Sequence, residues 1–580
     1  MNAITRFLLV GALAVACAGN VSAAVPKGTD VSGLNVGKNT EKNYRHRVFH
    51  AYMPLEKVRE IYKISNYSKF ENPTGIYFRP GDKVKITLTG TPESPVCLRT
   101  RNFNVDNGQE KEYALKPGVN EITIANEGLG YIDYRSEKPA EAPTITVDIE
   151  GGAISGVFTR ADSNATWKKM LAETPSPILD LMGERVQLAF DVARLREYCP
   201  DDGVELLRIY DRVIEAEHEI MGWDIFDCHP GNHVLGRSMQ GGFMHADGLG
   251  AAFTVNALKG ITQIDLLRDH GWGVAHEFGH VNQVRPALMW AGTTEVTNNI
   301  YSAWSQYILS PKKLRLEHEV IGGYGGIGAI MGGRMDQYIN DALVDRQLWQ
   351  YMKGPDNDGS KGTGDAFVTV CPLWQLQLYN SVARGDKKFY ARIHQSSRLK
   401  DYSKTPHGQL RARFTVEASK SAKLNFGEFF VKLGILAPMN RMVNDYSSHQ
   451  VTITPAMCDA AIKEMAKFPK PDSSVIYYIN GNNVKIFKDK AAVVPSPSFT
   501  FNAQADKRYK VPYCTVPADQ WKNAVAFEAY AGKKLVRISL RGLGQEDQAS
   551  TMVFAPEGTT EVKAVQWDGK RYTVWSDKQS

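Results

Sequence analysis

The sequence predicts a multidomain α+β protein, in which a mainly helical central domain is flanked by N-terminal and C-terminal β-sandwich-like domains. Two observations lead to this fold class. Alternating and β-branched runs, separated by turns rich in Gly, Pro, Asp and Asn, occupy residues 75–154 and 475–580, as in antiparallel sheets. Between these regions, several segments carry apolar residues at helical spacing. At 580 residues, the chain is long enough for about three domains.

Composition divides the chain into four parts. We expect a signal peptide at 1–23, an N-terminal β-sandwich-like domain at 24–154, a central domain at 155–470 and a C-terminal β domain at 471–580. The internal boundaries are placed where stretches rich in Gly or Pro interrupt the periodic patterns.

The first residues have the pattern of an export signal. A short basic start, Met1 to Arg6, precedes an apolar stretch from Phe7 to Ala16 that is too short to span a bilayer. Cleavage after Val21-Ser22-Ala23 releases a soluble protein, whereas a degenerate lipobox ending at Cys17 attaches a lipid. The leading Leu of that lipobox is displaced by one position, which favours the soluble form. We therefore expect a secreted, periplasmic or cell-surface protein without a transmembrane segment.

Charge and cysteine content narrow the function classes. The net charge is only +6, from 69 basic and 63 acidic residues, and no basic run is long, so we expect no nucleic-acid partner. The later cysteines are scattered and contain no C-x-x-C, which argues against a cysteine-based zinc site. An oxidising compartment permits disulfides, and Cys199 with Cys228 is the pair that we would test first. We expect a monomer.

The two β regions show their strands by alternation. In the N-terminal region, strands are expected at Ile76–Phe78, Lys83–Thr89, Asn120–Ile124 and Thr144–Ile149. In the C-terminal region, they are expected at Ala524–Tyr530, Val536–Leu540, Glu561–Trp567 and Tyr572–Trp575.

Helices are expected before and throughout the central part. Their ranges are Pro54–Ile61, Pro175–Glu197, Gly203–Ile220, Glu295–Leu309, Met335–Met352, Lys387–Ser396, Gln409–Ser419, Gly427–Leu433 and Pro455–Lys467.

The most informative stretch is Gly271–Asn299, which contains His276-Glu-Phe-Gly-His280. On a helix, residues four apart lie on one face, so both imidazoles can bind one ion. A catalytic zinc keeps three protein ligands and one open position, and a carboxylate from a neighbouring helix is a natural third ligand. Glu295 is the best-placed carboxylate. Glu277 would face the water at the open position, take its proton and later pass it to the leaving amine.

Other residues could support this site. Asn299, one helical turn after Glu295, would orient that ligand. Trp272 and Trp290 flank the ligands and could stack on a substrate, although a Trp beside a buried helix more often packs in a core. Tyr379 could donate to a developing oxyanion, although a helical Tyr is more often packed.

A second group of histidines lies in a Gly-rich patch upstream of the motif. Pro230 and Gly231 break any helix between His229 and His233. We therefore interpret these two histidines, together with His245, as loop or cleft residues and not as a second metal site.

The motif stretch resembles the enhancin-like zinc metallopeptidases, a gluzincin family. Their pattern is H-E-x-x-H, a variable gap, then G-x-x-E with Asn four residues beyond the Glu. The matching residues are His276, Glu277, His280, Gly292, Glu295 and Asn299. The resemblance covers about residues 155 to 470 and implies a gluzincin-type peptidase domain with one catalytic zinc ion. It also leads us to interpret Ala251–Val255 as the sheet-edge strand that lies along the substrate backbone, since an edge strand offers unpaired amides and carbonyls to an extended peptide.

The resemblance also suggests a substrate. Family members include host-associated bacterial and viral enzymes that cut mucins, several of them next to O-glycosylated Ser or Thr. The leading hypothesis is a secreted zinc endopeptidase that acts on mucin-type O-glycosylated glycoproteins. One alternative is a glycan-binding adhesin with a weak peptidase fold, and another is a general secreted zinc peptidase without a glycan requirement. The presence of Glu277 argues against the adhesin, because a purely binding protein has no need of the base.

Overall fold

The computed structural model describes residues 42–106, 109–319, 332–349, 365–497, 499–501, 511–543 and 550–577. The expected signal peptide and the lipobox Cys17 lie outside these residues. The chain forms two compact units, the first ending at Asn282 and the second beginning at Gln283, with Ile220–Gly222 grouped with the second. Both contain helices and strands, which confirms the α+β mixture. No helix of the described residues is long and apolar enough to cross a membrane.

The first unit begins with two antiparallel sheets, of strand order β1-β8-β3-β6 and β5-β4-β7-β2-β9. The bounds are β1 (His46–Phe49), β2 (Pro73–Phe78), β3 (Lys83–Thr89), β4 (Val96–Arg101), β5 (Glu110–Leu115), β6 (Gly118–Thr123), β7 (Gly128–Asp133), β8 (Ile145–Glu150) and β9 (Ala153–Ile154). A short helix, α2 (Leu55–Tyr62), lies where one was expected.

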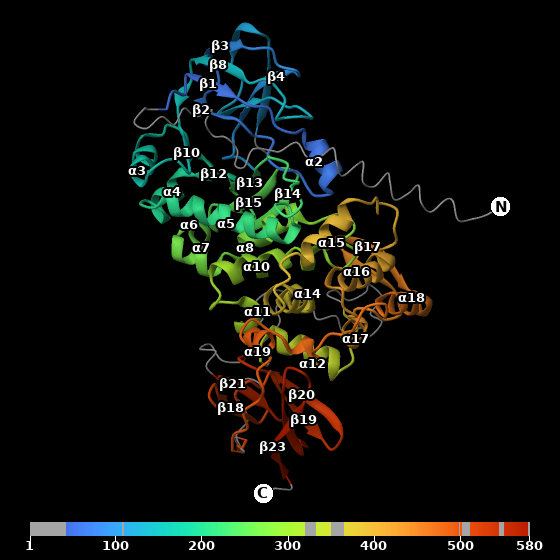
Figure 1. Ribbon diagram of the computed structural model, residues 1–580. Coiled ribbons are helices and arrows are strands. Elements are labelled where there is room, and N and C mark those ends of the chain that lie inside the picture. The colour runs from blue at the N-terminus through green and yellow to red at the C-terminus, as the bar shows by residue number, and fades with distance from the viewer. Residues whose placement is uncertain are drawn as a thin grey trace, which may run out of the picture. The chain divides into compact units, whose positions relative to one another are not determined.

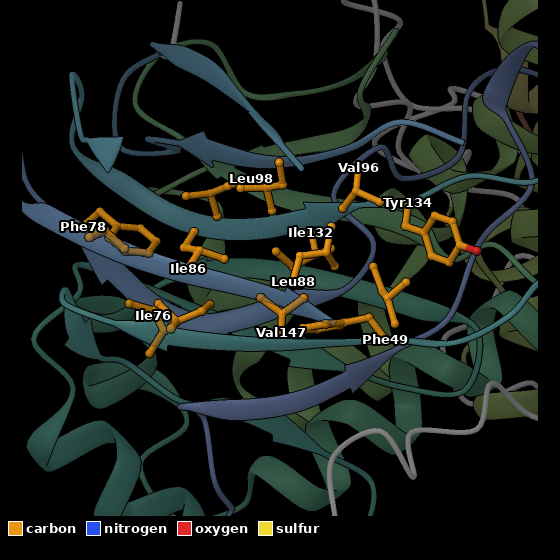
Figure 2. Close-up of a cluster of buried hydrophobic side chains, with 14 of the residues drawn as sticks. Phe49, Ile76, Phe78, Ile86, Leu88, Val96, Leu98, Ile132, Tyr134 and Val147 are labelled. Carbon is orange, nitrogen blue, oxygen red and sulfur yellow. The ribbon is translucent and has the colours of Figure 1, made fainter. Parts of the chain in front are cut away.

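The two sheets share one apolar core. Along β3, the side chains of Val84, Ile86 and Leu88 are buried, while Lys83 and Lys85 are exposed. Apolar side chains of both sheets meet in one cluster, which Figure 2 shows from Phe49 on β1 to Leu98 on β4. Strands that bury one face and expose the other are typical of a β-sandwich.

A mixed sheet of six strands follows, in the order β10-β11-β12-β13-β15-β14. Its strands are β10 (Val157–Thr159), β11 (Ile178–Met182), β12 (Val186–Asp191), β13 (Val234–Met239), β14 (Met244–Asp247) and β15 (Gly250–Thr254). The helices of this part are α3 (Asn164–Glu173), α4 (Val192–Tyr198), α5 (Gly203–Met221), α6 (Leu258–Thr262), α7 (Ile264–His270) and α8 (Trp272–Asn282) (Figure 1).

Two expectations for this sheet were wrong. The helix expected at Pro175–Glu197 is the β11–β12 hairpin followed by α4. Both strands are buried almost throughout, so their apolar residues show no alternation that separates a strand from a helix. The edge strand is also misassigned, because β15 lies between β13 and β14 and the outer strand is β14.

Helices make up most of the second unit. They are α9 (Thr294–Thr297), α10 (Asn299–Leu309), α11 (Arg315–His318), α12 (Arg334–Leu343), α13 (Ala366–Thr369), α14 (Cys371–Gln377), the π-helix η2 (Leu378–Ala383), α15 (Phe389–Arg398), α16 (His407–Ala422), α17 (Gly427–Lys432), α18 (Pro455–Met465), the 3-10 helix η3 (Ile476–Tyr478) and α19 (Val484–Asp489). The helix expected at Glu295–Leu309 is thus two helices that meet at Asn298, and the one expected from Met335 ends at Leu343.

A hairpin that the periodicity did not predict interrupts these helices. Its strands are β16 (Met439–Asp445) and β17 (Ser447–Ile453), joined by Tyr446. Helix α16 packs against β17, as Figure 1 shows. The approach is close: a Cβ added to Gly408 would lie 1.9 Å from the carbonyl oxygen of Thr452, so only glycine fits there.

The second unit ends in strands around a separate apolar core, as the alternation predicted. They are β18 (Tyr513–Pro517), β19 (Ala526–Ala531), β20 (Lys534–Leu540), β21 (Ser550–Phe554), β22 (Glu561–Val565) and β23 (Arg571–Ser576), arranged as a β18-β21 pair and a β20-β19-β22-β23 sheet.

The suggested Cys199–Cys228 disulfide is not formed, because both residues are free thiols.

Candidate metal centre

Helix α8 carries the motif and is held against the mixed sheet by its apolar face. It packs on β14, β15 and β13. Phe278 is fully buried, with its ring 6.2 Å from that of Tyr210 and 6.0 Å from that of Phe253. This packing fixes the rotation of the helix about its axis, so the face that carries His276 and His280 is only half-buried.

His276, Glu277 and His280 have the spacing of metal-binding groups. Their nitrogen and carboxylate ligand atoms all lie within 4.8 Å of one another. The two imidazole rings are 4.7 Å apart and nearly perpendicular, at 87°. Zinc binds imidazole nitrogen at ~2.0–2.1 Å, so two rings this close can share one ion. Glu277 is only 6% exposed, so its side chain is shielded from bulk water.

A buried chain of hydrogen bonds holds the end of α8. The Tyr67 hydroxyl donates to Asn282 Oδ1 at 2.6 Å, and the Asn282 amide donates to Glu217 Oε2 at 2.7 Å. Behind Tyr67, His218 Nε2 lies 3.3 Å from the hydroxyl, and His218 Nδ1 lies 3.0 Å from His229 Nε2. Since the tyrosine proton goes to Asn282, both histidines fit this chain as neutral imidazoles that each donate one proton toward Tyr67.

Burial shifts the pKa values of the groups in this hydrogen-bond chain toward their neutral forms. It lowers the pKa of His218 and of His229 well below the usual value, which keeps both rings neutral. It also raises the pKa of Glu217 well above the usual range, although the hydrogen bond from Asn282 opposes the shift. In the hydrogen-bond network that anchors α8, burial thus favours the uncharged form of all three groups.

The upstream histidines do not form a second centre. Within the described residues, His276, Glu277 and His280 are the one cluster with metal-ligand spacing. His233 is fully buried and lies 2.7 Å from Glu71, whose charge raises the pKa of the imidazole. His229 and His233 lie outside helices and strands, as expected of loop residues, whereas His245 lies in strand β14. The pair with Glu71 makes the burial of His233 tolerable.

Glu295 lies in the second unit, in the short helix α9. The Asn299 side chain donates to the backbone carbonyl of Glu295 at 2.8 Å, and the hydroxyl of Tyr446 donates to its Oε1. Gln283, three positions after His280 in the chain, donates to the Thr294 carbonyl at 2.9 Å. Polar contacts thus hold both the backbone and the carboxylate of Glu295.

The three residues expected to contact substrate lie in packed surroundings. Trp272 is 3% exposed and Trp290 is 1% exposed, and the Trp290 ring lies 5.4 Å from that of Phe414. Tyr379 is 3% exposed, and its hydroxyl donates to Asp472 at 2.7 Å. These contacts favour packing over substrate binding for all three.

Sequence reasoning did not single out Asn282, Asp445 or Tyr446. Asn282 follows the motif directly, and only its burial and its partners mark it. The alternation in Val451–Ile453 after a polar turn was the available sign of the hairpin that presents the other two.

Two family descriptions match the chain. Residues 154–434 match peptidase M60, enhancin and enhancin-like, and residues 39–148 match the N-terminal domain of M60-like peptidases. Among curated proteins, a TRPM8 channel-associated factor homolog of Xenopus laevis is 27% identical over 217 residues, which are 37% of this chain and 22% of that protein. The chain thus spans about a fifth of this relative's length.

Solved structures of similar fold include a metallopeptidase in complex with Tn antigen, with 23% identity and a TM-score of 0.69 over 91% of this chain and 98% of that one. Another is the M60 catalytic domain of Clostridium perfringens ZmpC in complex with the sialyl T antigen, with 19% identity and a TM-score of 0.60 over 90% of this chain and 99% of that one. At these identities the likeness shows the fold. The family matches and the motif on α8 together show that this chain belongs to the M60 peptidases, enhancin and enhancin-like, and is a metallopeptidase.

Proposed function

We propose that the protein is a secreted zinc endopeptidase that hydrolyses peptide bonds in mucin-type O-glycosylated glycoproteins. The observation that carries the catalytic part is the grouping of His276, Glu277 and His280 on one face of α8. Two imidazoles and an adjacent sheltered carboxylate are the groups that metal-assisted hydrolysis needs.

Each residue has a separate role. His276, His280 and Glu295 hold the ion, which when bound polarises the scissile carbonyl and makes water more acidic. Glu277 accepts a proton from the attacking water and then delivers it to the nitrogen of the leaving amine. Its low exposure keeps bulk water from competing for that proton.

Glu295 is the third ligand on the strength of its sequence position and its local contacts. It follows Gly292 in the G-x-x-E pattern that comes after the histidines. Asn299 and Gln283 hold the backbone around it, so the residue is presented in one orientation. A ligand fixed in advance loses less conformational entropy when the ion binds.

The outer strand β14 suits an extended peptide substrate. It is the edge of the mixed sheet, and α8 packs against it. A peptide that pairs with this edge would lie beside the helix that carries the histidines. Phe243, just before β14, is 68% exposed and offers an apolar contact at the end of that edge.

The glycan part rests on two structural relatives, one in complex with Tn antigen and one with sialyl T antigen. Both ligands are O-glycans, which supports a glycosylated peptide as the substrate of this protein. The expected export signal, in residues that the structure does not describe, accords with an extracellular glycoprotein substrate.

The test is cleavage of an O-glycosylated mucin and of its deglycosylated form by the purified protein, with and without a chelator. Cleavage of the glycosylated form alone, lost with the chelator and in Glu277→Gln, is the expected result. Cleavage of both forms would instead support the general peptidase. Retention on a mucin column without cleavage would support the adhesin.

A further inference from the structure

We propose that Asp445 and Tyr446, at the turn of the β16–β17 hairpin, position Glu295 for metal binding, an inference that rests on the proposed function. Asp445 holds the backbone that leads into α9, and Tyr446 holds the carboxylate itself. Neither residue belongs to the motif, and both act through Glu295.

One oxygen of Asp445 accepts hydrogen bonds from the backbone that leads to Glu295. Its Oδ2 accepts from the backbone amides of Gly292 at 2.8 Å, Thr293 at 3.1 Å and Thr294 at 3.1 Å. The Thr294 hydroxyl donates to the same oxygen at 2.9 Å. Successive amides that converge on one anion fix the backbone between them.

Gly292 makes this convergence possible. Its φ is +88°, in the left-handed region that favours glycine. A residue with a side chain would be strained there, and its Cβ would lie 3.2 Å from Val443 of β16. The glycine of the G-x-x-E pattern is thus explained by the turn that lets three amides face Asp445.

Burial makes the Asp445 contacts strong. The residue is 6% exposed, so these hydrogen bonds compete little with water. Four hydrogen bonds compensate the burial of Oδ2, and removal of this oxygen would leave three backbone amides without their acceptor.

Tyr446 contacts the carboxylate directly. It is 83% exposed, yet its hydroxyl donates to Glu295 Oε1. Its φ is +60°, an uncommon conformation for a bulky residue, and the paired strands on both sides maintain it. We expect a large aromatic side chain to lie outside the core, at the tip of a turn, when its hydroxyl makes a functional contact. A hydrogen bond to one carboxylate oxygen restricts rotation of the whole group.

The hairpin has a firm base. β16 and β17 pair from Met439 with Ile453 to Asp445 with Ser447. Val443 and Val451 are buried, and α16 packs on β17. The turn therefore presents Asp445 and Tyr446 as a fixed unit.

The experiment measures Zn²⁺ affinity of the metal-free full-length protein by competition with a chromogenic chelator. Tyr446→Phe keeps the ring and removes the hydroxyl, and we expect it to weaken Zn²⁺ binding about 10-fold, the usual cost of losing a partner of a metal ligand. The kcat should fall with KM unchanged, and the melting temperature of the metal-free protein should stay the same. Asp445→Ala should weaken binding at least as much, and Asp445→Asn, which keeps an acceptor oxygen, should recover part of the loss.

Ser448→Ala is the matched control. Ser448 is an exposed residue of the same hairpin, and its hydroxyl donates to Asn444 at 2.7 Å and not to Glu295. Its Zn²⁺ affinity should stay within about twofold of the wild type, because the side chain lies on the surface and does not contact the ligand.

Glu295→Ala separates the two possible failures. If Glu295→Ala binds Zn²⁺ as tightly as the wild type, Glu295 is not a ligand and the ligand set of the proposed function is wrong. If Glu295→Ala weakens binding but Tyr446→Phe and Asp445→Ala do not, only the present inference is overturned. A lower melting temperature of Tyr446→Phe with unchanged affinity would also overturn it, because the tyrosine would then only stabilise the hairpin.

Discussion

The histidine pair and Glu295 are held in opposite ways. Helix α8 is fixed by Phe278 in the core and by a buried chain of hydrogen bonds at Asn282. Glu295 is fixed by a polar turn, one of whose residues, Tyr446, is largely exposed. The first support is part of the fold, so its loss should destabilise the protein. In the second support, the Tyr446 hydroxyl acts on the Glu295 side chain alone, so its loss should change metal affinity and leave the fold intact.

The largest expected effect comes from the histidines themselves. His276→Ala or His280→Ala should lower bound zinc from about one ion per chain to a small fraction, because a catalytic site has only three protein ligands. The far-UV circular dichroism should be unchanged, since both side chains are only half-buried. Elemental analysis after gel filtration measures the metal. Full occupancy in both variants would refute the assignment of α8 as the metal helix.

Glu277→Gln separates metal binding from chemistry on the same helix. Peptide hydrolysis should fall about 10²- to 10⁴-fold, the usual contribution of a general acid–base group. Zn²⁺ affinity and melting temperature should match the wild type, because the amide has the size of the carboxylate. The initial rate of mucin cleavage at saturating Zn²⁺ is the measurement, and a wild-type rate would rule out the proton-transfer role.

Asn282→Ala tests the buried support of α8. It should cost about 2–4 kcal/mol, since Tyr67 and Glu217 would each lose a buried hydrogen-bond partner. The drop should show as a lower melting temperature in the metal-free protein. Asn440→Ala, on the exposed side of β16, is the control and should change stability by less than about 0.5 kcal/mol. Equal effects of the two variants would mean that the network does not support the helix.

The smallest effect is a pH dependence from Glu217. Burial raises the pKa of this carboxyl in the folded protein above its unfolded value, so its contribution to stability is complete below the unfolded pKa and is lost as the pH rises toward the folded pKa. One such group changes stability by at most about 1.4 kcal/mol per pH unit. Glu217→Gln should therefore gain in melting temperature relative to the wild type over the pH range above the ordinary carboxyl pKa. Parallel melting curves across that range would contradict the shift.

Local patterns predicted much of the fold. The alternation of Lys83–Thr89 placed β3 at its observed bounds, because one face is buried and the other is solvated. The helical spacing of Gly203–Ile220 likewise placed α5. The β11–β12 hairpin was missed because strands buried on both faces carry continuous apolar runs, which look like a buried helix. The division of the chain into four parts stays a prediction.

The site shows the same limit. All residues of HEFGH lie in one helix, so the juxtaposition of His276, Glu277 and His280 follows from helical geometry alone. The supports come from distant segments: Tyr67 and Glu217 reach Asn282, and Asp445 and Tyr446 reach the Glu295 segment. No spacing rule connects residues so far apart in the chain.

The sequence by itself determined the chemistry: which side chains can bind a metal and which can transfer a proton, because a helix places residues four apart on one face. The tertiary structure decided which strand is the sheet edge, which aromatic residues are buried, and which turn holds Glu295. These outcomes depend on how segments far apart in the chain pack together, and packing is set by the shape and burial of all the segments at once.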